Sequence, residues 1–141
     1  MDTPTVKERW YRLCKGLGLG GEAMWIEFET AYLTSGRAYH NLGHIVDCLQ
    51  LLDEHRSLAI DPTAVELSVW FHDVVYDTRM QDNETISAGM AGEFLVGTRF
   101  EHEVPRLILA TRHDGTPGSP DARLLCDIDI SILGAPPARY H

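Results

Sequence analysis

The sequence lacks long hydrophobic runs, a secretory signal and paired cysteines. No stretch approaches the roughly 18 uninterrupted apolar residues of a membrane-spanning helix, and the amino terminus has no apolar segment of the kind found in signal peptides. We therefore expect a cytoplasmic protein without a membrane partner. The three cysteines, Cys14, Cys48 and Cys126, are odd in number and widely spaced, which predicts buried thiols rather than a disulfide framework.

Basic side chains are in the minority. The chain has 12 Lys and Arg residues against 21 Asp and Glu residues, for a formal net charge of -9. A field of this sign repels nucleic-acid polymers and anionic membranes. A small phosphorylated molecule remains compatible, because a bound divalent cation reverses the local potential. The length of 141 residues, with 44% hydrophobic and 23% charged side chains, predicts a single globular domain spanning 1–141.

The sequence also lacks an alternating apolar pattern long enough to build a sheet, whereas apolar residues recur at helical spacing almost throughout. The predicted fold class is therefore all-α. Asp61 and Pro62 form a helix start signal, because the aspartate can cap the first amides and the proline presets φ. Asp82 and Asn83 can cap another helix. The helices are expected at 6–17, 22–33, 42–52, 62–73, 82–95, 101–112 and 121–133.

Imidazoles and carboxylates occur at unusual places in this pattern. His40 and His44 are four residues apart, so on a helix both could address one point. Taken alone, a polar helix start and a hydrogen-bonded core histidine would explain this pair about two times in three. His72 and Asp73 are flanked by apolar residues on nearly every side. Burying an unpaired carboxylate there would cost several kcal/mol, so Asp73 needs a cation or dense hydrogen bonding.

Asp127 and Asp129 pose a similar problem within an apolar helical stretch. Residues two apart on a helix diverge by about 200°, so only one can face a given ion, and the spacing does not say which. Two solvated carboxylates on an exposed face explain this pair equally well. Together, however, the three segments offer nitrogen and oxygen donors that suit Mn, Fe, Co, Ni, Zn or Mg. Such a mixed set leaves positions open for water or substrate, and it therefore favours a catalytic metal site over a closed structural one.

In this order, His44, the His72-Asp73 doublet and Asp129 resemble the H…HD…D signature of the HD-domain superfamily of metal-dependent phosphohydrolases. The segments around them resemble an uncharacterised bacterial branch of predicted HD phosphohydrolases over about residues 6 to 138. The matching segments are YHNLGH at 39–44, FHDVVYD at 71–77, DNE at 82–84 with SA at 87–88, and DISILG at 129–134. The resemblance implies an HD-domain-like helical bundle that holds one divalent metal ion through His44, His72, Asp73 and Asp129.

The first and last motifs are also similar to cyclic-nucleotide phosphodiesterases, whose YHNxxH run uses its first histidine as a general acid and its second as a metal ligand. This similarity implies that His40 is the proton donor and His44 a ligand. Their Asp-Leu-Ser motif matches 129–131, which implies that Asp129 is the ligand and that Asp127 supports it.

The phosphodiesterases also carry a further metal-site histidine after the doublet, and this sequence has Tyr76 and Asp77 in its place. That difference favours one metal ion over two.

Several other polar residues could take part. Glu84 or Asp77 could accept a proton from metal-bound water or orient a ligating histidine, although Glu84 could equally interact with a positive helix end. His113, Arg112 and Asp127 could serve a second metal or bind phosphate. A histidine at a helix C-terminus is also explained by the helix dipole, and most arginines are solvated surface residues.

We therefore predict an enzyme that uses metal-activated water to hydrolyse a phosphoester bond in a small phosphorylated molecule, with a nucleotide as the leading candidate. A non-catalytic metal- or nucleotide-binding module is one alternative. A di-iron oxygenase, which some HD domains resemble, is a second. Relatives in this branch usually continue past residues 135–140 into further helices, which would make this sequence truncated at its C-terminus. Loss of those helices would expose apolar surface and favour a homodimer.

Overall fold

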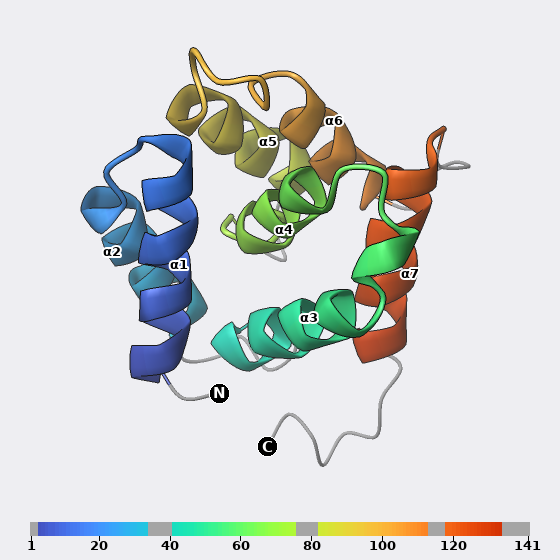
Figure 1. The fold of residues 1–141 in the computed structure, drawn as a ribbon, viewed down its shortest axis with the longest axis horizontal. Coiled ribbons are helices and arrows are strands. Elements are labelled where there is room, and N and C mark those ends of the chain that lie inside the picture. Colours follow the sequence, from blue (N-terminus) through green and yellow to red (C-terminus); the bar gives the residue numbers. More distant parts are fainter. Residues whose placement is uncertain (1–2, 34–40, 76–81, 113–117, 134–141) are drawn as a thin grey trace.

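The computed structural model describes residues 3–33, 41–75, 82–112 and 118–133, and within these ranges the fold is all-α, as predicted (Figure 1). None of the helices described is long and apolar enough to cross a membrane. The elements are α1 (Thr3–Leu17), α2 (Glu22–Tyr32), α3 (Leu42–Glu54), a short 3-10 helix η1 (Arg56–Leu58), α4 (Pro62–Phe71), α5 (Asn83–Phe94), α6 (Glu103–Ala110) and α7 (Pro120–Leu133).

Helix α4 is the centre of the bundle, and it packs against α3, α5, α6 and α7 (Figure 1). Every residue from 64 to 71 is buried, as expected for a helix that is apolar on nearly all sides. The helix starts as the sequence predicts: Pro62 occupies the first turn, and the Asp61 carboxylate accepts a hydrogen bond from the Ala64 amide at 3.3 Å. The residues that directly follow α4 therefore lie inside the bundle.

The end of α4 differs from the prediction, which extended this helix through Asp73. The helix ends at Phe71, and His72 is its C-cap, with the His72 amide bonded to the Ser68 carbonyl at 2.9 Å. A turn follows, in which the Val74 amide donates to the Phe71 carbonyl at 3.1 Å. The apolar pattern continues across this point because the turn is also buried, so the pattern alone could not mark the boundary.

Trp10 joins the pair of helices α1 and α2 to the rest of the core. Its ring centroid lies 4.8 Å from that of Phe28 on α2, 5.3 Å from that of Trp70 on α4 and 5.5 Å from that of Phe94 on α5. Contacts between aromatic rings of this kind contribute about 0.5–1.5 kcal/mol each beyond area burial. The Trp10 indole also donates to the Gly21 carbonyl at 2.9 Å, which fixes the connection between α1 and α2.

Asp121, in the first turn of α7, fixes α7 against the start of α4. This carboxylate is 4% exposed. It accepts hydrogen bonds from the backbone amides of Ile60 at 2.7 Å and Asp61 at 2.9 Å. Since α7 and the end of α4 both carry polar residues singled out in the sequence, this link helps to set the relative position of those residues.

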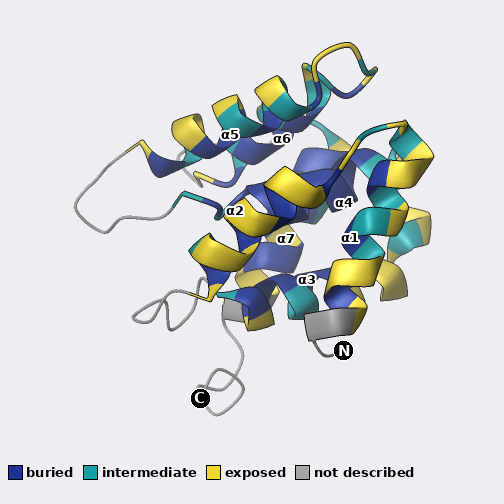
Figure 2. Cartoon of the chain, turned by 90° about the vertical axis from the view of Figure 1, so that its left-hand side faces the viewer, coloured by how far each residue is buried: buried dark blue, intermediate teal, exposed yellow. Residues whose placement is uncertain are grey.

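The remaining helices lie close to their predicted ranges, with shifted ends. α1 begins at Thr3, three residues before its predicted start, and α6 is shorter than the predicted 101–112. Asp82 occupies the N-cap position of α5, but its side chain makes no capping hydrogen bond. Figure 2 shows α5 with its exposed residues outward and its buried residues toward the interior. The three cysteines are buried and form no disulfide, as predicted. On α6 the buried face is formed by Val104, Leu107 and Ile108.

Candidate metal centre

Four of the residues singled out in the sequence lie together in the fold. His44 comes from α3, His72 and Asp73 from the turn after α4, and Asp129 from α7. One potential ligand atom from each lies within 4.8 Å of the others, and the group could hold a metal ion. Adjacent side chains on a helix would point about 100° apart. The side chains of His72 and Asp73 nevertheless meet, because His72 Nε2 and Asp73 Oδ2 lie 3.3 Å apart.

His44 is placed by the start of α3. The side-chain oxygen of Asn41 caps this helix by accepting a hydrogen bond from the His44 amide at 3.0 Å. The His44 side chain is fully buried, and its Nε2 lies 2.9 Å from Asp129 Oδ1 and 3.6 Å from Asp73 Oδ2. One imidazole nitrogen therefore meets both carboxylates of the group.

His72 is oriented at both of its nitrogens. Its Nδ1 lies 2.8 Å from the Val69 carbonyl oxygen. A carbonyl only accepts hydrogen bonds, so Nδ1 carries a proton, and when the ring is neutral Nε2 holds the lone pair that a metal ion could bind. Nε2 lies 3.3 Å from both Asp129 Oδ1 and Asp73 Oδ2. A backbone acceptor behind a histidine is the arrangement that orients metal-ligating imidazoles.

The group requires positive charge. It holds two carboxylates, and the side chains of Asp129 and Asp73 are only 8% and 14% exposed. Burial lowers the pKa of His72, but the carboxylates of Asp73 and Asp129 more than offset this, so its pKa lies well above the usual value. Burial raises the pKa of Asp129, yet hydrogen bonds from His44 and His72 bring that pKa well below its usual range. The interior carboxylates thus attract a cation, which can be a proton on imidazole or a divalent metal ion.

The two aspartates of α7 have different environments. Asp129 is buried and belongs to the group, whereas Asp127 is exposed and lies outside it. The helix turns by about 200° between them, so packing of α7 against α3 and α4 decides which carboxylate enters the interior.

Cys48 borders the group and was not predicted there. It lies one turn after His44 on α3, and its Sγ is 3.6 Å from His44 Nε2. Burial raises the pKa of this thiol well above its usual value, and the charges of Asp129 and Asp73 raise it further. A neutral thiol therefore covers one side of His44. The spacing of four residues from His44 is the sequence signal that would have found it.

The other predicted residues are not in the four-residue group. Glu84 is half-buried in the first turn of α5. This helix is linked to the turn after the doublet, because Ser87 Oγ accepts a hydrogen bond from the Val75 amide at 3.0 Å. Arg112 is exposed just after α6. The positions His40, Asp77 and His113 fall outside the described residues, as do Tyr39 and Tyr76.

Comparisons of the sequence and fold with protein-family models, with curated proteins and with solved structures give no significant match. The function is therefore inferred from the motifs in the sequence and from the placement of their residues in the fold.

Proposed function

We propose that this protein is an HD-type phosphohydrolase that binds one divalent metal ion through His44, His72, Asp73 and Asp129. Its substrate would be a small phosphorylated molecule, with a nucleotide as the leading candidate. The observation that carries the proposal is the convergence of two imidazole and two carboxylate donors, from three parts of the sequence, within 4.8 Å of one another. Such nitrogen and oxygen donors suit Mn, Fe, Co, Ni, Zn or Mg.

The donor set fits a divalent ion, which when bound would lower the pKa of coordinated water and polarise a phosphoryl oxygen. His44 and His72 would hold their Nε2 atoms toward the ion, the latter through its Nδ1 contact with Val69. The His44 and His72 side chains are 0% and 1% exposed, whereas that of Asp73 is 14% exposed. Water and substrate would therefore approach from the side of Asp73.

We assign proton transfer to three residues outside this group, His40, Glu84 and Asp77. His40 would protonate the leaving oxygen, and it immediately precedes Asn41, the cap of the helix that carries His44. An imidazole has an unperturbed pKa of about 6.5 and can hold or release this proton near neutral pH. Glu84, with Asp77 as the second candidate, would accept a proton from water or orient a ligand. The bond between Ser87 and Val75 supports a position of α5 close to the doublet.

A second candidate function is a non-catalytic metal-binding module. The observation in its favour is that four donors suffice to close a tetrahedral structural site, and three of them are almost wholly buried. Metal binding alone does not distinguish the two functions, because both use the same ligands. They differ in whether phosphate is released.

The test combines metal analysis with an activity screen. The purified protein is stripped with a chelator, reloaded separately with each of the six metals, and assayed on a generic phosphoester and a panel of nucleotides. We expect one ion per protein molecule and hydrolysis with at least one metal. Asp73→Ala should lower the activity by at least about a hundredfold, because even residues that only support metal ligands typically contribute about 10- to 100-fold.

Glu93→Ala is the matched control, since Glu93 is an exposed carboxylate on α5 outside the group. It should keep both metal and activity. Tight 1:1 metal binding with no hydrolysis under any combination would favour the binding module. Two irons per protein molecule with oxygen consumption would favour the oxygenase, and loss of an ion in Asp127→Ala would argue for a second metal.

A further inference from the structure

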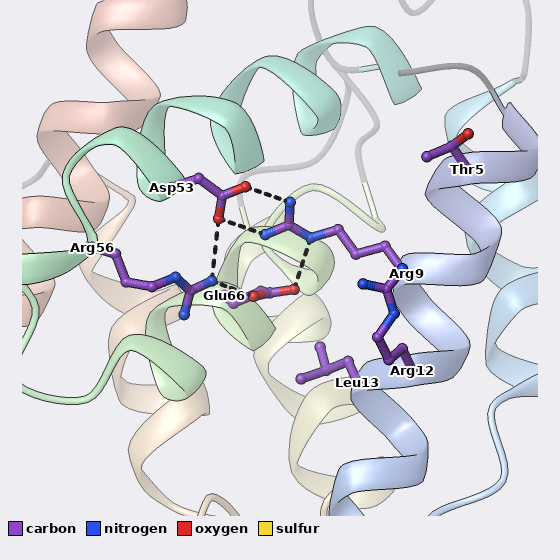
Figure 3. A pocket seen from close by; sticks show the side chains of 7 residues that line it. All are labelled: Thr5, Arg9, Arg12, Leu13, Asp53, Arg56 and Glu66. Carbon is purple, nitrogen blue, oxygen red and sulfur yellow. Dashed lines mark hydrogen bonds and ion pairs between the residues drawn. The ribbon is translucent and has the colours of Figure 1, made fainter.

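A cavity lined mostly by charged side chains lies between α1, the end of α3, η1 and α4, and we call it the arginine pocket (Figure 3). Its volume is about 470 Å³. Its position is distinct from the metal centre, because Asp53 lies nine residues after His44, about 13.5 Å further along the axis of α3. The pocket is lined by Thr5, Arg9, Arg12, Leu13, Asp53, Arg56 and Glu66.

Both carboxylates of the arginine pocket are already engaged. Arg9 contacts Asp53 through Nη1 at 2.7 Å and Nη2 at 3.0 Å, and contacts Glu66 through Nε at 3.1 Å. Arg56 Nη2 contacts Glu66 at 2.7 Å and Asp53 at 3.3 Å. The four side chains form a closed ring of ion pairs, which Figure 3 shows in dashed lines. Their charges cancel within the ring.

Arg12 adds a positive charge that this ring does not balance. It lies three residues after Arg9 on α1, so the two side chains share one face of the helix. Figure 3 shows the Arg12 guanidinium turned toward the pocket beside Arg9. Arg12 is exposed. The lining thus holds three arginines against two carboxylates, and this excess of positive charge occurs on a protein with a net charge of -9.

Arg56 offers further donors on the opposite side of the pocket. A guanidinium has five N–H groups in a fixed fork. The bonds of Arg56 to the two carboxylates all come from Nη2, so Nε and Nη1 are not used in the ring. Arg56 is half-buried, with its side chain 39% exposed. Arg12 and Arg56 therefore both have N–H donors that a ligand could use without any break in the ring.

We propose that the arginine pocket binds a small phosphorylated anion through Arg12 and Arg56. Guanidinium forks match phosphate oxygens in geometry and charge. A volume of about 470 Å³ lies within the range of roughly 300–1,000 Å³ found for small-molecule sites. The ring of Arg9, Asp53, Arg56 and Glu66 forms the rigid wall of the site, and Leu13 provides an apolar surface for the rest of the ligand. This proposal does not rest on the proposed function.

The experiment titrates the purified protein of 141 residues with inorganic pyrophosphate and follows arginine Nε–Hε and backbone amide signals by NMR. We expect saturable shifts at Arg12 and Arg56, with affinity reduced about three- to tenfold in Arg12→Gln. Arg123→Gln is the matched control, because Arg123 is an exposed arginine on α7, and it should bind like the wild type. Added salt should weaken the binding.

A repeat in Asp73→Ala separates this pocket from the metal centre. Unchanged shifts at Arg12 and Arg56 in that variant support the proposal. The proposal is overturned if binding disappears in Asp73→Ala, if Arg12→Gln binds as well as the wild type, or if the shifts avoid the pocket. The absence of saturation at millimolar pyrophosphate would overturn it too.

Discussion

Glu66 shows how a single buried charge shapes its surroundings. It lies on α4, where every neighbour along the helix is buried, and it is itself only 6% exposed. A carboxylate at such a position is costly unless it is paired and hydrogen-bonded. Arg9 and Arg56 each contact one of its oxygens, at 3.1 Å and 2.7 Å. One carboxylate on the central helix therefore holds α1 and η1 in place.

Asp53 makes the stability of the fold depend on pH on the acid side. The hydrogen bond from Arg9 lowers the pKa of Asp53, burial opposes this, and the charge of Arg9 and the contact with Arg56 lower it further, to a value below 3.8. A lowered pKa contributes stability that is present above the unfolded value and is lost as the pH falls through the folded value. We therefore expect the free energy of unfolding to fall as the pH drops below about 4.

Urea unfolding at a series of pH values and constant ionic strength measures this effect. Asp53→Asn should be less stable than the wild type at pH 7 and should lose less stability on acidification, with a modest difference because the Asp53 side chain is 46% exposed. Part of the acid dependence of stability should remain in Asp53→Asn because of Asp61. Burial raises the pKa of Asp61, but the hydrogen bond from Arg99 and backbone hydrogen bonds bring it below the usual value. If the free energy of unfolding changes with pH in parallel for Asp53→Asn and the wild type, the ion pairs of Asp53 contribute nothing to the acid dependence.

At the scale of elements, two glycines near the end of α1 should respond in opposite directions to alanine. A Cβ on Gly21 would lie 2.8 Å from Trp10 Nε1 and 2.9 Å from Cys14 Sγ, whereas one on Gly16 would meet nothing within 4 Å. We expect Gly21→Ala to destabilise the protein by about 1–3 kcal/mol through overpacking. Gly16→Ala, inside α1, should stabilise it by about 0.5 kcal/mol. Chemical denaturation measures both, and a change of the same sign in the two variants would contradict this account.

The helices themselves were largely predictable, because apolar residues recur at helical spacing in the sequence, although α4 is apolar on nearly all sides. The start of α4 was predictable for a further reason: Asp61 and Pro62 act locally, through a cap and a fixed φ. The end of α4 was not, because Val74 is as buried as the helix before it. Burial sets the apolar pattern, whereas backbone hydrogen bonds set the boundary.

The residues of the candidate site were also predictable only in part. His44, His72 and Asp73 stood out because polar groups interrupt apolar stretches. The choice between Asp127 and Asp129 could not come from spacing, because it depends on which face of α7 meets α3 and α4. The position of Cys48 beside His44 was missed, since a cysteine in an apolar stripe is usually a core residue.

At the scale of the whole molecule, the candidate metal centre joins helices that are distant in the sequence. Its residues come from α3, the end of α4 and α7, and these three helices contact one another pairwise. In the unfolded state the three segments that carry these ligands, at His44, at His72-Asp73 and at Asp129, would be far apart and would bind an ion weakly. Binding of a metal ion should therefore be coupled to folding, because a ligand specific to the native state stabilises that state.

Metal ions should accordingly raise the Tm of this protein. At a free metal concentration 100 times the Kd, the gain is about 2.7 kcal/mol, which corresponds to roughly 10 °C for a protein of this size. Calorimetry of the stripped protein, with and without each metal, measures the increment. Asp129→Ala should lose the increment, whatever its own stability without metal, while Glu93→Ala should keep it. An equal increment in Asp129→Ala would mean that the ion binds elsewhere. Asp129 contacts both histidines of the group, so its loss would weaken the binding of any ion held among them.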